Sequence, residues 1–405
     1  MKKKHTLSQQ RGNNSTDLLF YNRRLILKLI RKHSVISRIE LAELSGLKPA
    51  TITIIINEFI EKNLVEDCGL IEGKNGRRVK GVRLVDSNYC TISVRITSSY
   101  FAIGIFDINL SCIAVEKKKY KSYDNFYQTL ADINNKIEEF SILANDYEIL
   151  GISLGLQNDF FMDYSSDATF CIFGPDSRID IAAFFKASCP YPVYIERAVD
   201  FTAYHVYTKD YIHNINEKIV LTLDFSTSVD LSILHHGSLY HGAYSSAHCF
   251  SEIYVHDSEN TLKNIEEVLS IDAIMQHAIN LLPDYPGSSL QDLSEFTYRN
   301  LINAYSNKDP LALVVYDHIA DMLAQFLIIL MKLFSPHSIL IGDEIPPEAA
   351  FLKTVTSYLT KYDTFSLYSK TEIVNITGRR STQLDAVLLG GSSLVIDNEL
   401  PKHIL

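Results

Sequence analysis

Five histidines crowd one short stretch of the chain, and imidazoles together with cysteine thiolates are the usual ligands of zinc. They are His235, His236, His241, His248 and His256, with Cys249 among them. No two have the i,i+3 or i,i+4 spacing that would place a pair of ligands on one face of a helix. The six cysteines of the chain are scattered as well, and none lies in CxC or CxxC spacing. The pattern predicts surface histidines in a polar loop, with no metal site, no disulfide scaffold and no cofactor.

A second set of residues has the chemistry of DNA recognition. Ser37 and Glu40 have the spacing of a capping box, in which each side chain satisfies the other residue's backbone N–H. They predict a short helix from Arg38 to Leu44, after which Gly46 permits a tight turn. Pro49 suits the first turn of a second helix, where its missing N–H costs nothing. Two short helices joined in this way are typical of a helix-turn-helix, whose second helix enters the major groove N-terminus first.

The exposed positions of these helices predict the contacts with DNA. Cationic side chains suit phosphates, small methyl groups suit thymine, and an amide can read a base edge. The predicted contacts in the helices are Arg38, Lys48, Ala50, Thr51, Thr53 and Asn57. A turn-rich loop then leads into a strand from Val79 to Leu84, and this predicts a β-hairpin wing. Its cations Lys74, Arg77 and Arg78 suit phosphates or a narrow minor groove. The alternative is a small helical protein-interaction domain with a basic hairpin.

The charge of the chain is distributed unevenly between this head and the rest. Residues 1–85 hold 17 Lys or Arg and 8 Asp or Glu, whereas the remaining residues hold 21 and 40. A small basic head on a large acidic body predicts that the head meets a polyanion, double-stranded DNA, while the body has another task.

The length of 405 residues suggests two or three domains. The most apolar stretch, Met322–Phe334, is interrupted by Gln325 and Lys332, and the basic start MKKKHTLSQQ has no apolar segment behind it. We therefore expect a soluble, cytoplasmic protein with no membrane contact.

After Leu84 the pattern becomes α/β, with helices predicted at Tyr127–Asn145, Ile265–Leu282 and Pro310–Phe334. Two hairpin-like starts, Thr91–Asp107 and Ile219–His235, are each followed later by helices, which predicts a duplicated α/β core. The expected division is a flexible arm (1–17), a winged helix-turn-helix (18–86), a first α/β subdomain (87–195) and a second subdomain with dimerisation helices (196–405). The last helix of the second subdomain can pack back on the first.

The whole chain from about Asn22 to Ile396 resembles the ROK family, which groups sugar-responsive repressors with sugar kinases of the actin-like ATPase fold. The stretch SRIELAELSGLKPATITIIINEFIEKNLVE, followed by GRR, is the most specific part and looks like the winged helix of xylose- and N-acetylglucosamine-type repressors. The segments LTLDFSTSVDLSILHHGSLYHGAYSSAHCFSEI, FSPHSILIG and LDAVLLGGSSLVI also match. The resemblance implies a winged helix-turn-helix followed by an actin-like ATPase fold.

The resemblance also implies that the catalytic parts of the kinases are missing. Arg95 stands where the first phosphate loop carries a carboxylate, and Ala198 stands where the catalytic base is expected. Ser226-Thr227-Ser228 replaces the second glycine-rich phosphate motif, and Val255 replaces the histidine of the family's zinc site. Because phosphoryl transfer needs close backbone approach and a carboxylate base, we expect no catalytic residue.

Three carboxylates match the family's sugar site: Asp200, Glu252 and Glu266. Arg197 stands where a sugar-binding asparagine is usual, and two explanations of this residue are open. It can pair with an anionic effector such as a sugar phosphate or sugar acid, or it can neutralise Asp200 or Glu196 in an inert cleft. The effector-binding set is therefore Arg197, Asp200, Glu252 and Glu266.

Three functions follow. The first is a transcriptional regulator, expected to be a repressor of carbohydrate-utilisation genes, that binds a palindromic operator as a homodimer or dimer of dimers and senses a small carbohydrate. The second is a ROK sugar kinase with an added head. The third is a regulator whose body only dimerises or docks a protein.

We predict that replacing Arg77 and Arg78 together by Ala weakens operator binding and flattens its salt dependence. The reason is that the salt slope falls by about 1 for each phosphate that the protein no longer neutralises. Binding titrations at several salt concentrations measure both quantities. An unchanged affinity and slope would show that the wing does not bind DNA.

Overall fold

The structure is a computed structural model. It describes residues 15–72, 78–85, 89–97, 99–119, 126–157, 161–163, 169–173, 178–211, 219–225, 228–242, 253–257, 260–291, 296–342, 345–363, 366–376 and 385–404.

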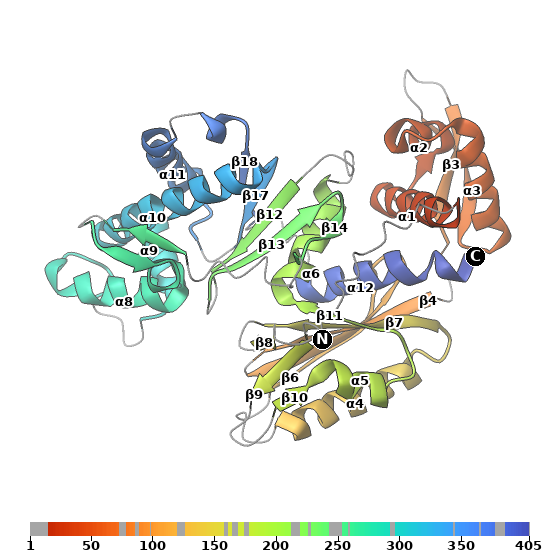
Figure 1. The fold of residues 1–405 in the computed structure, drawn as a ribbon, viewed down its shortest axis with the longest axis horizontal. Helices are drawn as coiled ribbons and strands as arrows, with labels where there is room; N and C mark the ends of the chain where they lie inside the picture. Colours follow the sequence, from red (N-terminus) through yellow and green to blue (C-terminus); the bar gives the residue numbers. More distant parts are fainter. Residues whose placement is uncertain are drawn as a thin grey trace, which may run out of the picture.

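The head, red in Figure 1, is a winged helix-turn-helix, as predicted. Three helices pack beside a small antiparallel sheet of order β1-β3-β2. The helices are α1 (Ser15–His33), α2 (Arg38–Ser45) and α3 (Pro49–Glu61), and the strands are β1 (Ile36–Ser37), β2 (Val65–Glu72) and β3 (Arg78–Leu84). Helix α1 begins inside the range expected to be an arm, while residues 1–14 lie outside the described residues.

The local signals of the sequence explain the turn between α2 and α3. Ser37 Oγ accepts a hydrogen bond from the backbone N–H of Glu40, whose side chain accepts one from the N–H of Ser37, so the capping box is confirmed. Gly46 ends α2 with a φ of 69°, a left-handed conformation that glycine adopts without strain. Pro49 then opens α3.

The first body sheet has the order β11-β7-β4-β5-β6. Helices α4 and α5 cover one face, and α12 and α6 cover the other (Figure 1). The strands are β4 (Tyr89–Ile96), β5 (Tyr100–Asp107), β6 (Cys112–Lys119), β7 (Glu148–Leu156) and β11 (Val193–Arg197). The helices are α4 (Phe126–Leu143), α5 (Ile181–Ser188), α6 (Ala198–Val206), which continues into the π-helix η3 (Tyr207–Tyr211), and α12 (Ala386–Glu399). A separate three-stranded sheet consists of β8 (Phe161–Asp163), β9 (Thr169–Phe173) and β10 (Arg178–Asp180).

The second body sheet, of order β14-β13-β12-β17-β18, also begins with an antiparallel hairpin and continues with parallel pairs. This repeated start confirms the predicted duplication. The strands are β12 (Ile219–Asp224), β13 (Asp230–His235), β14 (Ser238–Leu239), β17 (Ser338–Ile341) and β18 (Glu372–Asn375). Strands β15 (Tyr254–His256) and β16 (Leu262–Asn264) pair apart from it. The helices of this half are α7 (Glu266–Leu269), α8 (Ile271–Leu281), α9 (Tyr298–Ser306), α10 (Pro310–Phe334) and α11 (Ala349–Tyr362), with short 3-10 turns at Leu282–Asp284, Leu367–Ser369 and Lys402–Ile404.

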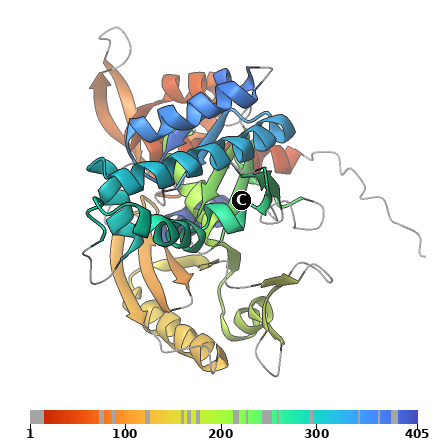
Figure 2. The same ribbon diagram turned by 90° about the vertical axis from the view of Figure 1, so that its left-hand side faces the viewer.

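Helix α10 is, among the described residues, the one helix long and apolar enough to cross a membrane, but 61% of its most apolar window is buried inside the protein. Its side chains form the centre of the second half's hydrophobic core, against β12, β17 and α11. Figure 2 shows α10 lying between α11 and α8. The apolar composition of α10 is therefore explained by the core it fills.

Helices α6 and α12 pack with their backbones in contact. A Cβ atom added at Gly390 would lie 1.8 Å from the carbonyl oxygen of Phe201, so only glycine fits there. Although α12 comes last in the chain, it lies on β4 and β7 of the first sheet. Strand β11 also crosses the expected boundary between residues 195 and 196. The expected division of the chain stays a prediction.

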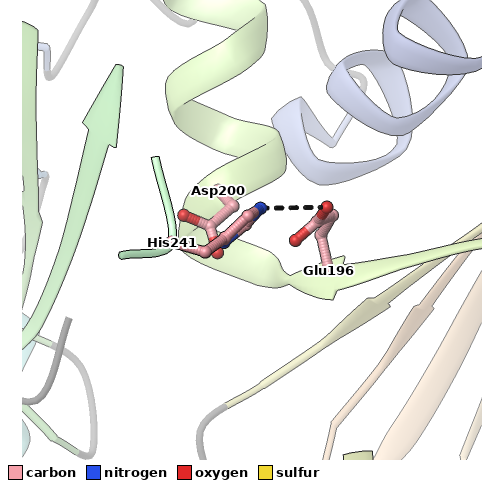
Figure 3. Close-up of side chains that lie close together, drawn as sticks. All are labelled: Glu196, Asp200 and His241. Atoms are coloured by element: carbon pink, nitrogen blue, oxygen red, sulfur yellow. Dashed lines mark ion pairs between the residues drawn. The ribbon is translucent and has the colours of Figure 1, made fainter. Parts of the chain in front are cut away.

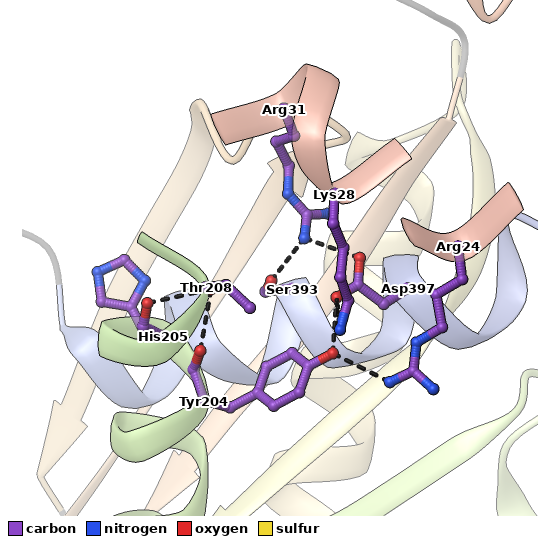
Figure 4. Close-up of polar contacts among 8 residues, drawn as sticks. All are labelled: Arg24, Lys28, Arg31, Tyr204, His205, Thr208, Ser393 and Asp397. Carbon is purple, nitrogen blue, oxygen red and sulfur yellow. Dashed lines mark hydrogen bonds and ion pairs between the residues drawn. The ribbon is translucent and has the colours of Figure 1, made fainter. Parts of the chain in front are cut away.

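The head is joined to the body through Asp397 of α12 (Figure 4). Its side chain is 0% exposed and forms ion pairs with Arg31 at 2.8 Å and Lys28 at 3.3 Å, both from α1 of the head. It also accepts a hydrogen bond of 2.6 Å from the hydroxyl of Tyr204 on α6. A second bond, from Arg31 to Ser393, extends the contact along α12.

Burial and charge compete at this junction. Burial alone would raise the pKa of Asp397, but Arg31, Lys28 and Arg24 outweigh it and hold the pKa below its usual value. Burial, reinforced by Arg24 and Arg31 and opposed by Asp397, lowers the pKa of Lys28 to about 7. One carboxylate thus compensates several cations.

We expect Asp397→Asn to weaken the docking of the head by about 3–5 kcal/mol, because it leaves the charges of Lys28 and Arg31 buried without a counter-charge. Differential scanning calorimetry should then show the head unfolding separately, at a lower temperature than the body. The matched control is Asp132→Asn, which removes an exposed pair with Lys118 and should cost less than about 1 kcal/mol. Equal effects of the two substitutions would refute this role of Asp397.

Candidate functional site

The N-terminal end of α3 presents several of the predicted DNA contacts to solvent. Lys48 is the N-cap residue and makes no side-chain capping bond, because its ammonium group only donates and the first N–H groups of the helix need an acceptor. Lys48 is exposed. Ala50 and Thr53 are exposed and Thr51 is half-buried. The hydroxyl of Thr53 donates to the carbonyl of Pro49 at 3.0 Å.

Arg38 and Asn57 are brought together across the two helices. The guanidinium of Arg38 donates to Asn57 Oδ1 at 3.3 Å and lies 3.6 Å from Asp67 Oδ1 on β2. The amide oxygen of Asn57 therefore already accepts a hydrogen bond within the head, and the donor end of the amide is its NH₂ group.

Ile54, also on α3, was not in the predicted set. It is 60% exposed and so does not belong to the hydrophobic core of the head. An apolar side chain on a recognition helix can contact thymine methyl groups. The helical period could have found it, since at 100° per residue Ile54 falls between the predicted contacts Ala50 and Thr51 around the helix.

The wing is described in part. Strands β2 and β3 pair antiparallel, with Glu72 opposite Arg78, and Arg78 is exposed at the start of β3. Lys74 and Arg77 lie outside the described residues, as does Glu252 of the predicted effector set.

In the body, Arg197 lies at the junction of the two sheets. Its Nε and Nη2 donate to the two oxygens of Asp200, both at 2.8 Å, and Nη2 also donates to the carbonyl of Leu231 at 2.9 Å. A second carboxylate, Asp230, lies 3.5 Å from Nη1. Because β11 belongs to the first sheet and β13 to the second, this one side chain joins the two halves. The geometry therefore favours neutralisation of Asp200 over a free cation awaiting an anionic effector.

Asp230 was missed by sequence reasoning. Its side chain is 15% exposed. Burial raises the pKa of Asp230 well above its usual value, and the neighbouring Asp224, Asp200 and Glu266 act in the same direction, while Arg197 opposes them. Its place two residues after the altered phosphate motif was the available signal.

A further polar group beside Arg197 consists of Glu196, Asp200 and His241, shown in Figure 3. One ligand atom from each lies within 4.8 Å of the others. His241 Nε2 is 3.4 Å from Glu196 Oε1. Burial raises the pKa of Glu196, and the hydrogen bond to Glu196 raises the pKa of His241, so the two groups favour sharing a proton.

The donor set of this triad resembles that of a metal site, although the sequence predicted none. Both oxygens of Asp200 are already occupied by Arg197, a fixed cation. Such an arrangement suits ligand hydroxyl groups better than a metal ion, because a second positive charge would be repelled.

Glu266, at the start of α7, accepts a hydrogen bond from the backbone N–H of Val229 at 3.3 Å. This bond fixes Glu266 beside Asp230, and their charges interact. The structure thus gathers Arg197, Asp200 and Glu266 from the predicted set. It adds Glu196, Asp230 and His241.

Arg95 makes an ion pair of 2.8 Å with Asp385, the N-cap residue of α12. Ala198 is the first residue of α6 and has no group that could accept a proton. Val255 is buried in β15 at 3% exposure.

Comparison with known families agrees with this architecture. The model described as "ROK family" matches residues 91–398, and a model of winged helix-turn-helix DNA-binding domains matches residues 19–66. The chain belongs to the ROK family. The combination of this body with a DNA-binding head makes the chain a transcriptional regulator, as predicted.

Similar ROK proteins include regulators and enzymes. The chain is 22% identical to the DNA-binding transcriptional repressor Mlc of Escherichia coli K12, over 85% of this chain and 86% of Mlc. It is 24% identical to the xylose repressor of Staphylococcus xylosus, over 94% and 95%. A solved ROK transcriptional regulator, a homologue of E. coli Mlc, shares the fold with a TM-score of 0.72 and 19% identity, over 96% and 98%. A ROK glucokinase of Streptomyces griseus shares it with a TM-score of 0.58 and 18% identity, over 75% and 98%.

We predict that Asp230→Asn stabilises this ROK protein at neutral pH by about 0.5–2 kcal/mol, the usual range for a stabilising substitution. A carboxyl whose pKa is raised by folding holds its proton longer in the folded chain, so its contribution to stability falls as the pH rises above about 3.9. The gain should therefore shrink as the pH is lowered toward about 4. Urea unfolding at several pH values measures it.

Asp200→Asn is the matched control for this substitution. It removes the bidentate partner of Arg197 and should destabilise the protein instead. If Asp230→Asn destabilised the protein as strongly as Asp200→Asn, the claim that the burial of Asp230 is unfavourable would be wrong.

Proposed function

We propose that the chain represses carbohydrate-utilisation genes by inserting α3 into the major groove of a palindromic operator. The observation that carries this proposal is the start of α3, where Lys48, Ala50 and Thr53 are exposed together on a helix held by a capped turn. The proposed contacts in the helices are Arg38, Lys48, Ala50, Thr51, Thr53 and Asn57, with Ile54 added. Those in the wing are Lys74, Arg77 and Arg78.

The body acts in this proposal as a sensor and not as an enzyme. Arg95 places a cation, held by Asp385, where a nucleotide-binding carboxylate would be needed. Ala198 offers no base for a sugar hydroxyl. Losing a general base alone typically lowers a rate by about 10²–10⁴-fold. In this proposal the chain therefore shares the fold of the sugar kinases and not their activity.

The effector is a small carbohydrate bound where the two sheets meet. Glu196 and Asp200 can accept hydrogen bonds from sugar hydroxyl groups, His241 lies beside them, and the two bonds from Arg197 orient Asp200. Glu252 and Glu266 complete the proposed set. A neutral sugar is favoured over a sugar acid, because the guanidinium of Arg197 is already paired.

The protein in this proposal is cytoplasmic and acts as a homodimer or dimer of dimers, since a palindrome presents two equivalent half-sites. The effector changes operator affinity only if it binds two arrangements of the heads with different affinities.

The first test is a pull-down of fragmented genomic DNA with the purified protein, followed by sequencing. We expect enrichment of one palindrome beside carbohydrate genes. Asn57→Ala should lower affinity for that palindrome by about 1–3 kcal/mol, the value of one base contact. The control Lys353→Gln, an exposed residue on α11, should leave the affinity unchanged.

A sugar panel added to the same assay tests the sensor. The effector should change the enrichment and also stabilise the free protein, by about 2.7 kcal/mol at 100 times its Kd. If no sugar changed the enrichment of the palindrome, the role of the body would be dimerisation or protein docking. ATP consumption with any sugar would overturn the non-enzymatic body.

A further inference from the structure

Helix α6 carries one polar residue into each of two distant junctions of the protein. Asp200, in its first turn, holds Arg197 where the two sheets meet. Tyr204, one turn further along, bonds to Asp397 where the head meets the body. The two positions are four residues apart, so they lie on the same face of α6, separated by about 6 Å along its axis. Figure 4 shows Tyr204 pointing from α6 toward Asp397.

The hydroxyl of Tyr204 joins the head to the body. It donates a hydrogen bond of 2.6 Å to Asp397 on α12 and accepts one of 3.1 Å from the guanidinium of Arg24 on α1. The ammonium group of Lys28, also on α1, lies 4.9 Å from the centroid of the tyrosine ring, within the range of a cation–π interaction. Because Tyr204 is 0% exposed, water cannot replace these bonds if the side chain is displaced.

The helical geometry changes directly after Tyr204. Helix α6 ends at Val206 and continues as the π-helix η3. The hydroxyl of Thr208 lies 2.9 Å from the carbonyl oxygen of Tyr204 and 3.0 Å from that of His205, so one side chain serves two carbonyls of α6. Turns of π-helix are rare and occur frequently at functional sites. The end of α6 that meets the head is therefore the end at which the regular helical pattern stops.

We propose that Tyr204 couples the proposed effector site to the DNA-binding head. A sugar hydroxyl that bonds to Asp200 shifts the first turn of α6, and Tyr204 transmits this shift to Arg24 and Asp397. This inference rests on the proposed function, because it assigns a regulatory role to the same sugar site.

The coupling needs two arrangements of the head. In one, both hydrogen bonds of the Tyr204 hydroxyl are made and the head is docked on the body. In the other, both bonds are broken and the head is released. A sugar shifts this balance only by binding the two arrangements with different affinities. Tyr204 is thus a positioning residue, which contacts neither the sugar nor the DNA.

The first test needs no ligand. Hydrogen–deuterium exchange of the full-length protein, followed by mass spectrometry, reports how often α1 opens. Tyr204→Phe removes both bonds of the hydroxyl but keeps the ring, and should speed exchange in α1 about tenfold, the value of one hydrogen bond to a charged group. Asp200→Asn should also speed it about tenfold, within the usual range of coupling between sites.

The double variant distinguishes coupled from independent effects. If Tyr204 carries the coupling, Asp200→Asn adds nothing in the Tyr204→Phe background, and α1 exchanges about tenfold faster than in the wild type. Independent effects would multiply to about a hundredfold and would overturn the proposal. An unchanged exchange of α1 in the single variant Asp200→Asn would also overturn it.

Two controls separate coupling from a general loss of stability. Asp230→Asn alters the other carboxylate beside Arg197, but Asp230 lies on β13 and not on α6, so α1 should exchange as in the wild type. Helix α10, in the core of the second half, should keep its wild-type exchange in every variant. If α10 also exchanges faster in Asp200→Asn, Asp200→Glu takes its place, because it keeps the charge and displaces the carboxylate by one methylene group.

A second arm uses xylose, glucose and N-acetylglucosamine as probes, together with the enriched palindrome. For a probe that changes the operator affinity of the wild type, Tyr204→Phe should bind that sugar as tightly in isothermal titration calorimetry, while its operator affinity no longer responds. An undiminished response would overturn the proposal. If no probe binds the wild type, the effector site of the proposed function is wrong for these sugars, whereas the exchange measurements still decide whether Tyr204 links Asp200 to the head.

Discussion

The buried carboxylate of Asp397 determines how the DNA-binding head is placed. It accepts contacts from Lys28 and Arg31 of the head and from Tyr204 of the body, at zero exposure. A buried ion pair contributes little net stability, but it tolerates few alternative geometries because each misplacement leaves a charge unpaired. The junction therefore fixes an orientation more than it adds stability. Lys28 and Arg31, which contribute to the basic charge of the head, are turned toward this carboxylate.

Helix α6 connects this junction to the group around Arg197. Asp200 and Tyr204 are four positions apart, one turn along the helix, so the residue that holds Arg197 and the residue that bonds Asp397 lie on the same face. The close approach of Gly390 to Phe201 packs α6 directly against α12. Helix α6 therefore carries one contact of the two-sheet junction, at Asp200, and one contact of the head junction, at Tyr204.

Local signals made the head and the long helices predictable. Ser37, Glu40, Gly46 and Pro49 act within a few residues of one another, so the helix-turn-helix followed from their spacing. Helix α10 was predicted at its observed bounds, since its apolar period is long and Asp309 caps it.

Interactions between distant positions escaped prediction. Arg31 and Asp397 are 366 positions apart, and Asp230 reaches Arg197 only because two sheets meet. The helix expected from Ile265 to Leu282 is interrupted at Ser270, whose hydroxyl caps α8. Strand β6 was missed because its run of Glu116 and lysines is exposed at a sheet edge and carries no apolar alternation.

The position of Asp397 so late in the chain has a consequence for biosynthesis. The winged helix is complete once Leu84 has been translated, whereas the carboxylate that anchors it follows more than three hundred residues later. At about 5–20 residues per second, the head waits roughly 15–60 s before it can dock. During that interval a nascent chain carries a folded, basic DNA-binding module with no body to orient it. A message truncated before α12 would release the same unanchored module permanently.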